Sequence, residues 1–371
     1  MADIRAMRCL LFALLLPSLA EAQLITPDLL SVLPVQLNET SGLVVIDGAV
    51  WTVLDSGNPP AVLQVDPLNG TVTRTVQLIG ASNFDYEDIT ADANWVYIGD
   101  FGNNSGSRTD LRIYRFPRSA LEDVGIVSVQ VEVIAFSFAD QTDFTPAFNG
   151  TNFDCEAFVA MDDSLFLFTK RWIDETTRLY ALPAAPGTHV ASVRGDHDTD
   201  GLITAASWDG AGRLVLLGHE DDPGQPFIIH FNAVQGHDFF GQPGIRREVD
   251  LFDHQTEGIA WLTPDDWILS NELANGFPAA LWSIDVMSTR IASPSGDRIR
   301  AYPIPASDRI SFIGPHGTMR VELHDASGRI VLGSHEIIDG QVDVCDLAAG
   351  RYVARIACLG SEFRLPVVIA R

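Results

Sequence analysis

Acidic residues recur at one place in the sequence pattern, directly before runs of β-branched and aromatic residues. Such segments begin with DYEDIT at Asp85, DCEAFV at Asp154 and TEGIAW at Thr256. Carboxylates that converge on one point repel one another, so they need a cation, a lysine or hydrogen-bond donors nearby. These residue types therefore favour two kinds of chemistry, the binding of a hard cation and metal-assisted acid–base catalysis.

Each acidic segment is followed, after a short turn, by a second apolar run that ends in a polar residue. Aligning five such pairs of runs on their apolar positions gives ten equivalent positions at the starts of the first runs and the ends of the second. Eight of the ten carry an ionisable side chain, whereas random placement at 20% charged residues would give about two. The ten positions are Ser41, Glu87, Glu156, Ala206 and Glu257 in the first runs, and Asp55, Asp100, Lys170, His219 and Glu272 in the second.

The aligned positions supply one candidate site with two overlapping roles. Ca²⁺ takes six to eight oxygen ligands, and it is the cation that we expect here. In catalysis, His219 or Glu87 would act as the base and Lys170 would stabilise an anion. The candidate metal ligands are Asp55, Asp100, Glu87, Glu156, Glu257 and Glu272, with neutral oxygens from Asn58, Asn103, Asn104 and Asn271. The candidate catalytic residues are Glu87, Glu156, Lys170, His219, Glu257 and Glu272.

A purely structural role is the alternative for these acids, because a carboxylate can also accept hydrogen bonds from backbone amides and hold neighbouring strands together. We favour that role for the three aspartates near the strand starts, Asp85, Asp88 and Asp154, and the cation site for the three glutamates. The fourth unit has no acid in its first run, so we do not expect a fully symmetric site.

The elements that must position these residues are β-strands. No segment has the periodicity of an amphipathic helix, and short apolar runs are separated by Gly, Pro, Asn and Asp. Units of four strands recur at intervals of roughly 45 to 70 residues, which is typical of β-propeller blades. In a propeller the first strand of each blade lines the central channel, so the aligned positions would meet at one rim.

We therefore predict an all-β protein, with a β-propeller over residues 23–292. Five blades can be identified in the sequence, and a sixth is possible because the long connection at 140–152 could contain it. The segment LLSVLPVQL, residues 29–37, precedes the first unit. It can supply the outer strand that the fifth unit lacks, which would close the ring.

Residues 298–371 carry a different pattern of strands and Gly/Pro turns. The residues that stand out in this pattern are Tyr302, Pro303, Pro305, Ala306, Asp325, Gly328, Arg329, Leu347, Gly350 and Tyr352. With these residues at matching places, the region resembles the type A C-terminal sorting domain of the type IX secretion system, and it departs from that family in having Ile304 where Asn is usual. The resemblance implies a small Ig-like β-sandwich that is recognised by the outer-membrane type IX translocon.

The propeller units as a group also resemble known families. The segments DYEDI, YIGDFGNN, DCEAF and TEGIAW, within residues 38–285, are similar to blades of uncharacterised exported β-propellers. They are more remotely similar to SdiA-regulated and esterase-like phytase propellers, which share the acid-Glu-Gly-Ile/Leu blade start. This resemblance implies a fold rather than an activity, because function on propellers depends on the individual site.

The N-terminal sequence indicates export. Residues 1–22 combine Arg5 and Arg8 with an apolar run and a small-residue cleavage site before Gln23, which is the pattern of a signal peptide. No other stretch has the length of a transmembrane segment. We expect a protein that passes through the periplasm and is secreted or held at the outer cell surface.

The charge of the chain limits its partners. A net charge of −25 repels nucleic acid and anionic lipid and favours cations or neutral ligands. We expect no nucleic-acid partner and a monomer. Lys170 is the only lysine among 24 basic residues. One interpretation is that this position requires an ammonium group that an arginine cannot replace, and the alternative is a chance bias in composition. Cys345 and Cys358 could form a disulfide in an oxidising compartment.

These observations lead to one functional interpretation and two alternatives. The first is an exported propeller that binds Ca²⁺ and a small ligand or glycan at the channel mouth. The alternatives are a metal-dependent hydrolase of esters or phosphoesters and a protein-interaction platform. The sequence contains no Gly-x-Ser-x-Gly elbow and no His-Glu-x-x-His motif, which disfavours nucleophilic serine and zinc-protease chemistry.

Overall fold

The computed structural model describes most of the chain. The expected signal peptide, the Arg5 and Arg8 region included, lies outside the described residues. Within the described part, no helix has the length and apolar character needed to cross a membrane. The described ranges are 24–220, 224–285, 300–302, 306–313, 319–325, 329–337, 341–358 and 361–370.

Nearly all regular structure is β, as the alternating apolar runs predict. The first unit shows the local reason: Asp47 and Gly48 have φ of 51° and 78°, and Asp-Gly is preferred in the two-residue hairpin turn that needs such angles. Its strand order is β2-β3-β4-β5, with a short fifth strand, β9, added in parallel to β5. The bounds are β2 (Thr40–Ile46), β3 (Ala49–Leu54), β4 (Ala61–Val65), β5 (Val72–Ile79) and β9 (Ser128–Gln130).

The second and third units are joined into one eight-stranded sheet, because their outer strands β10 and β14 pair in parallel. A short helix, α1 (Ser119–Glu122), lies in the connection of the second unit. The second unit contains β6 (Tyr86–Ala91), β7 (Trp95–Asp100), β8 (Arg112–Pro117) and β10 (Glu132–Phe138). The third contains β11 (Asp154–Met161), β12 (Ser164–Lys170), β13 (Thr176–Pro183) and β14 (Gly187–Asp198).

The fourth and fifth units have four strands each, and the fifth is completed from the N-terminus. Strand β1 pairs antiparallel with β21, so the predicted outer strand lies where the sequence places it, although Val35–Leu37 forms a short 3₁₀ helix, η1, instead of a strand. The fourth unit contains β15 (Leu202–Trp208), β16 (Leu214–His219), β17 (Pro226–Phe231) and β18 (Ile245–Glu248). The fifth contains β19 (Thr256–Thr263), β20 (Asp266–Asn271), β21 (Ala280–Asp285) and β1 (Asp28–Val32).

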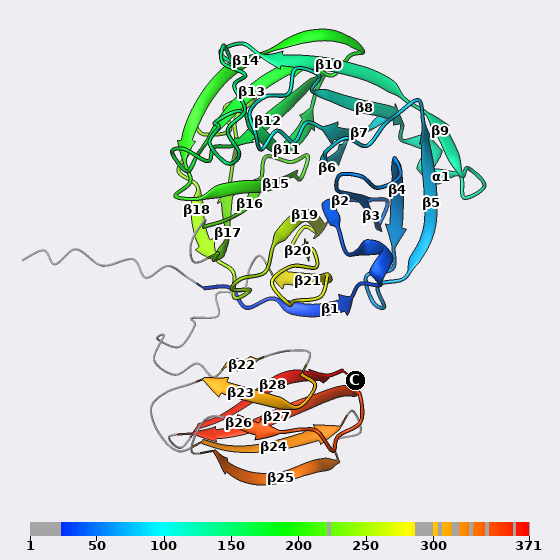
Figure 1. The fold of residues 1–371 in the computed structure, drawn as a ribbon. Coiled ribbons are helices and arrows are strands. Elements are labelled where there is room, and N and C mark those ends of the chain that lie inside the picture. The colour runs from blue at the N-terminus through cyan, green and yellow to red at the C-terminus, as the bar shows by residue number, and fades with distance from the viewer. Residues whose placement is uncertain are drawn as a thin grey trace, which may run out of the picture.

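The five innermost strands form a closed ring around a central axis (Figure 1). Each of β2, β6, β11, β15 and β19 contacts the next, and β19 contacts β2. Gly42 permits one of these close approaches, because a Cβ there would collide with Asp88 of the next unit. Residues 140–152, which the sequence analysis considered as a possible sixth blade, are described and form no strand.

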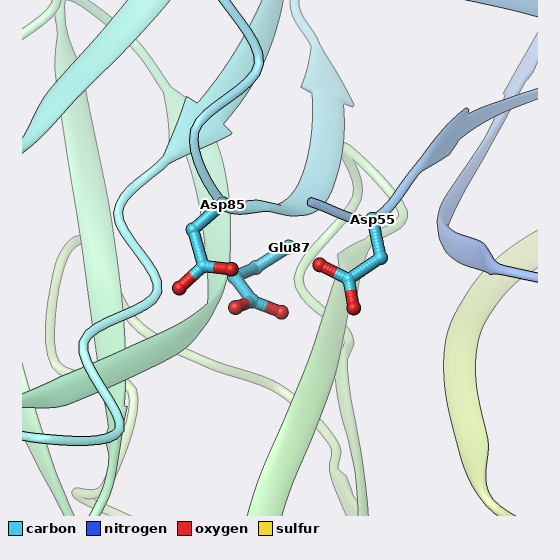
Figure 2. A group of neighbouring side chains, drawn as sticks. All are labelled: Asp55, Asp85 and Glu87. Atoms are coloured by element: carbon cyan, nitrogen blue, oxygen red, sulfur yellow. The ribbon is translucent and has the colours of Figure 1, made fainter. Parts of the chain in front are cut away.

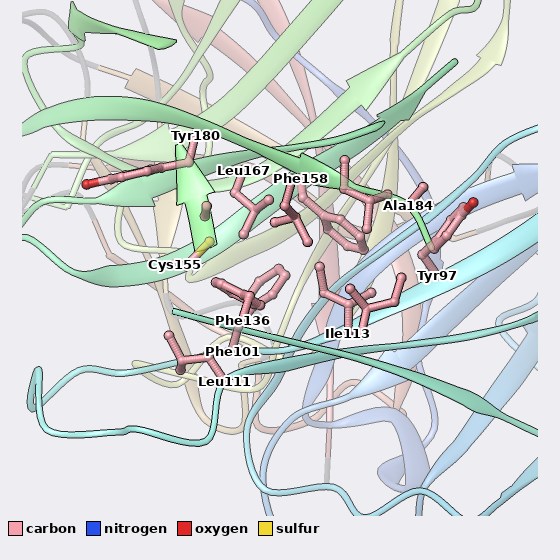
Figure 3. Packing of buried hydrophobic residues seen from close by; sticks show 14 of the residues in the cluster. Tyr97, Phe101, Leu111, Ile113, Phe136, Cys155, Phe158, Leu167, Tyr180 and Ala184 are labelled. Atoms are coloured by element: carbon pink, nitrogen blue, oxygen red, sulfur yellow. The ribbon is translucent and has the colours of Figure 1, made fainter. Parts of the chain in front are cut away.

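Apolar layers between neighbouring units hold the ring together. Five buried clusters each draw their side chains from two adjacent units, so every interface has its own core. Figure 3 shows the layer between the second and third units, where Phe101 and Phe158 pack edge to face with ring centroids 5.2 Å apart. Sheets packed face to face in this way bury both surfaces of every unit and leave the strand ends free to carry a site.

The C-terminal residues form two further sheets with a core of their own. The three-stranded sheet has the order β22-β23-β26, and the four-stranded sheet has the order β25-β24-β27-β28. Ala306, Ile310, Val321 and Ala354 are among the buried residues that the two sheets share. The side chain of Cys358 lies outside the described residues, so its disulfide with Cys345 stays a prediction. The bounds are β22 (Arg300–Tyr302), β23 (Arg309–Ile313), β24 (Met319–Asp325), β25 (Ile330–Ile337), β26 (Gln341–Asp343), β27 (Gly350–Cys358) and β28 (Ser361–Ile369).

Candidate functional site

A β-bulge marks the start of every innermost strand. The register slips by one residue at Glu87, at Glu156 and at Glu257, and similarly in the other two units. A bulge re-aims a side chain relative to the regular alternation of the strand. The bulged residues are Ser41 with Gly42, Glu87, Glu156, Thr204 and Glu257.

The bulges correct the sequence alignment at two positions. In the fourth unit the equivalent residue is Thr204, not Ala206. In the second unit Asp100 lies opposite Tyr86, one residue before the position that Lys170 and Glu272 occupy in their units. Because side chains alternate between the faces of a strand, one residue of slip turns the side chain away.

Asp100 accordingly does not line the axial cavity, in contrast to its predicted role as a metal ligand. Its carboxylate is buried and lies 3.0 Å from Arg108 Nη2 and 3.6 Å from Arg112 Nε. It also accepts a hydrogen bond from the backbone N–H of Asp85 at 3.1 Å. These contacts assign Asp100 to the support of the loop that carries Asp85.

Six acids and one lysine converge on a small cavity at one end of the channel. The cavity has a volume of about 90 Å³, and the predicted residues Asp55, Glu87 and Lys170 line it together with three other predicted acids. The complete lining is Ser41, Asp55, Asp85, Glu87, Asn104, Glu156, Lys170, Gln255, Glu257 and Glu272. Side chains that are up to 231 positions apart in sequence, from Ser41 to Glu272, therefore meet as the propeller prediction requires.

Asp55, Asp85 and Glu87 form the tightest group of carboxylates, and each offers an oxygen within 4.8 Å of the others. Figure 2 shows the three carboxylates turned toward one shared space. Glu87 is 9% exposed, and among the described residues no hydrogen bond to its carboxylate is found. The group is an all-oxygen donor set, which suits a hard cation such as Ca²⁺. Asp85 thus faces the cavity, where the sequence analysis favoured a purely structural role for it.

Asp88 and Asp154 have the structural role that the sequence predicts. The Asp88 carboxylate accepts the N–H of Phe158 in the next unit at 3.1 Å. Asp154 accepts the N–H of Asn103 in the preceding unit at 2.6 Å and the Trp172 indole N–H at 2.8 Å. Both aspartates therefore link neighbouring units by hydrogen bonds near the cavity.

Lys170 is the only cation in the cavity lining. Its Nζ lies 2.8 Å from Oε2 of Glu156 and 4.8 Å from the centre of the Trp172 ring. Burial by itself lowers the pKa of Lys170, but the charges of Glu156 and Glu257 outweigh it and hold the pKa above its usual value. Lys170 is therefore charged at neutral pH and balances part of the acidic charge.

Burial and neighbouring charges raise the pKa of other acids in the lining. Burial, and then the charge of Asp55, raises the pKa of Asp85 to about 7. Burial, followed by the charges of Glu257 and Asp55, raises the pKa of Glu272 to about 8. Burial and the charge of Glu156 hold the pKa of Glu87 well above its usual range. A cation that entered the cavity would favour the ionised forms and release protons.

Of the four asparagines predicted to add neutral oxygens, Asn104 alone lines the cavity. Asn271 accepts the Trp282 indole N–H at 2.7 Å, and Asn103 accepts the Arg108 backbone N–H at 2.9 Å. Asn58 donates to the backbone oxygen of Asp55 at 3.0 Å. The last three asparagines therefore shape the loops around the cavity.

A wider vestibule of about 500 Å³ adjoins the cavity and shares Asn104, Lys170 and Gln255 with it. His219 lines this vestibule and not the inner cavity. Sequence reasoning missed the aromatic residues here, since they lie in loops beyond the strand ends. The other lining residues are Phe148, Asn149, Trp172, Gly224, Phe252, Asp253, His254 and Asn275.

Comparison with known proteins finds structural similarity only. No protein-family model and no curated protein sequence matches the chain. The chain is similar to the extracellular domain of BT4673 from B. thetaiotaomicron, with 12% identity over 92% of this chain and 59% of that chain and a TM-score of 0.32. The chain therefore spans about three fifths of the BT4673 domain.

Two further solved structures are similar at the same level. One is the gluconolactonase XC5397 from Xanthomonas campestris, with 10% identity over 66% of this chain and 71% of that chain and a TM-score of 0.36. The other is the WD40 domain of Toxoplasma gondii coronin, with 12% identity over 95% of this chain and 85% of that chain and a TM-score of 0.30. These values are low, so no activity is transferred from those proteins to this chain.

Proposed function

We propose that this chain is an exported β-propeller that binds a hard divalent cation, Ca²⁺ in the first place, in the axial cavity and a small ligand or glycan in the vestibule. One observation supports the proposal above all others. Six carboxylates line a cavity of about 90 Å³ in which Lys170 supplies the only positive charge. A bound divalent cation would offset the repulsion between those carboxylates.

The size and chemistry of the cavity suit this role. A water molecule occupies about 30 Å³ of liquid, so about 90 Å³ accommodates one ion with one or two waters. Asp55, Asp85 and Glu87 offer three clustered carboxylate oxygens, and Asn104 and Gln255 offer neutral ones. Ca²⁺ tolerates such irregular oxygen cages, whereas Mg²⁺ demands near-octahedral geometry.

Thermal unfolding of the mature chain tests the proposal. After treatment with EDTA, Ca²⁺ at about 100 times its Kd should raise Tm by roughly 5 to 10 °C, because a ligand that binds only the folded state stabilises it. Glu87→Gln should weaken Ca²⁺ binding about tenfold or more, since it removes one charged ligand. Glu122→Gln, at an exposed position of α1, is the matched control. Unchanged melting with EDTA, Ca²⁺ and Glu87→Gln would reject the cation site and leave a protein-interaction platform.

A metal-dependent hydrolase of esters or phosphoesters is a second candidate, and the state of His219 favours it. Its Nδ1 donates to the backbone oxygen of Glu220 at 2.9 Å, which leaves Nε2 as the basic nitrogen. Burial, and then the charge of Lys170, lowers the pKa of His219 to about 4, so the ring is neutral at pH 7. A neutral imidazole beside a metal site can serve as a general base.

Turnover assays distinguish this candidate from binding alone. A panel of aryl esters and aryl phosphates is assayed with Ca²⁺ and with EDTA. Activity that needs Ca²⁺ and is lost in His219→Asn, but not in the control His189→Asn, a half-buried histidine outside both linings, would establish the hydrolase. No turnover of any substrate by a protein that binds Ca²⁺ would leave the binding function.

We also propose that residues 298–371 direct export through the type IX translocon to the cell surface or the medium. Contacts of three described motif residues are consistent with this proposal. Asp325 and Arg329 hydrogen-bond to each other at the β24–β25 connection, and Tyr352 Oη, in β27, donates to the Ala348 backbone oxygen at 2.7 Å. In a host with a type IX system, a chain that ends at residue 297 should stay in the periplasm, and the full chain should reach the surface. Export of both chains would contradict the proposal.

A further inference from the structure

The vestibule next to the acidic cavity combines negative charge with exposed aromatic surface, which narrows the class of small ligand that the proposed function assigns to it. We propose that the ligand is an amine. Its ammonium group would lie at the junction where the vestibule meets the axial cavity, and its carbon chain would contact the aromatic residues of the vestibule. This inference rests on the proposed function because it names the ligand class of the same site.

Charge at the junction selects a cation. The cavity lining holds six carboxylates, and the vestibule adds Asp253, whereas Lys170 is the only lysine or arginine in either lining. One ammonium and one divalent metal ion cannot neutralise all of these groups when they are ionised. A concave site lined by one sign of charge attracts ligands of the opposite sign, and the net charge of −25 reinforces that attraction. An anionic ligand would be repelled.

Lys170 shows how this site holds an ammonium group. Its Nζ is paired with the Glu156 carboxylate at 2.8 Å and lies 4.8 Å from the centre of the Trp172 ring. An aromatic face and a carboxylate together bind ammonium groups well, because the ring quadrupole adds to the ionic attraction. Glu87 is nine-tenths buried, and its carboxylate, to which no hydrogen bond is found among the described residues, faces the same cavity and can accept a second ammonium.

The vestibule offers apolar surface for a carbon chain. Phe148 is 81% exposed although it lines the vestibule, and Phe252 is 40% exposed. The backbone around Phe148 is held in place, since the N–H groups of Ala147 and Asn149 donate to the oxygens of Ser105 and Asn104 at 2.9 Å each. An exposed phenyl ring on a fixed loop at the mouth of a polar site is a surface that a ligand would cover.

A matched pair of linear probes tests the charge requirement. Binding of 1,6-diaminohexane and of the uncharged 1,6-hexanediol to the full mature chain is measured by calorimetry at pH 7 with Ca²⁺ present. We expect the diamine to bind at least about tenfold more tightly than the diol, which corresponds to about 1.4 kcal/mol. Equal affinity for the two probes would overturn the inference.

A second pair of probes separates an amine from a sugar. Glucosamine and glucose share one ring and differ in the ammonium group. The inference requires glucosamine to bind more tightly than glucose. Equal binding of the two sugars, or binding of glucose with no binding of the diamine, would identify the ligand as a neutral glycan and overturn the inference.

Variants show where the diamine binds. Phe148→Ala should lower the diamine affinity several-fold and leave Tm unchanged, because the side chain is mostly exposed. Phe144→Ala, on the same connection but outside the vestibule lining, should change neither. Diamine binding that Phe148→Ala does not reduce would be non-specific attraction to the acidic surface, and the inference would fall.

The inference and the proposed function can fail independently. If Ca²⁺ raises Tm but neither amine binds, the cation site stands and the amine inference is wrong. If the diamine binds and depends on Phe148 while Ca²⁺ has no effect, the amine inference stands and the metal site is wrong.

Discussion

At the scale of single residues, Glu156 and Lys170 form a buried ion pair in the lining of the axial cavity. Both side chains are less than one-tenth exposed, and their charged atoms lie 2.8 Å apart. A buried pair of this kind adds little net stability, but the loss of one partner leaves a charge that nothing compensates. Lys170 also faces Glu257, so it balances more than one carboxylate.

We expect Lys170→Met to lower the free energy of unfolding by about 3 to 5 kcal/mol at pH 7, because Glu156 would lose its partner. The double variant Glu156→Gln, Lys170→Met should recover a large part of that loss. A double-mutant cycle by urea unfolding measures the coupling. Additive effects of the two substitutions would show that the pair does not interact as the structure indicates.

Glu272 gives a second prediction at this scale, on pH. Its pKa is raised from 4.5 to about 8, so the folded protein holds a proton that the unfolded chain releases between those values. Glu272 therefore lowers stability increasingly as pH rises from about 5 to about 8 when no metal is bound. In EDTA, Glu272→Gln should have a Tm that exceeds that of the wild type by a margin that grows over this interval. Thermal melts of both proteins check it, and the control Glu122→Gln should show a constant margin.

At the scale of elements, the bulges and the ring closure position the site. The bulges of β6, β11 and β19 place one glutamate each at the cavity, and this explains why Glu87, Glu156 and Glu257 meet although they belong to different units. The segment that follows β1 contributes to closure, because Leu37 is fully buried between the fifth and first units. Stability of the ring that carries the site thus depends on a segment outside the innermost strands.

Two substitutions within η1 test this dependence. Leu37→Ala removes a fully buried side chain and should destabilise the protein by about 2 to 5 kcal/mol. Val35→Ala, at a residue that is 82% exposed, should change stability by less than about 0.5 kcal/mol. Denaturant unfolding of both variants compares them directly, and similar values would mean that the closing segment is not held as described.

At the scale of the whole molecule, the site and the C-terminal sheets depend on different cores. The core of the C-terminal sheets contains only residues from 301 onward, and the five propeller clusters contain none of them. The axial cavity is lined by residues from 41 to 272. Cation binding should therefore be a property of the propeller alone.

Truncation tests this separation. A mature chain that ends at residue 292 should show the same shift in Tm with Ca²⁺ as the full chain, since every lining residue is retained. Differential scanning calorimetry with EDTA and with Ca²⁺ measures both shifts. A truncated chain that folds but has lost the shift would show that the C-terminal residues contribute to the cation response.

Much of the architecture was predictable from local pattern. Alternating apolar runs and Asp-Gly turns specify strands and hairpins through short-range physics, and the missing outer strand of the fifth unit pointed to residues 29–37. The convergence of Asp55, Glu87, Glu156, Lys170, Glu257 and Glu272 also followed from the repeat, because equivalent positions of a ring meet at its axis. The errors at Asp100 and Ala206 share one cause, which is that a bulge shifts the register without a reliable signal in the sequence.

The sequence by itself therefore determined the strands, their repetition and the set of charged strand ends, since these depend on the polarity and turn preference of neighbouring residues. Only the tertiary structure decided which way each carboxylate points, that Asp85 joins the cavity while Asp100 pairs with Arg108, and that Phe148 and Trp172 come from separate loops to form one vestibule. Side-chain direction at a bulge and contacts between loops depend on packing across units, and that packing exists only once the ring has closed.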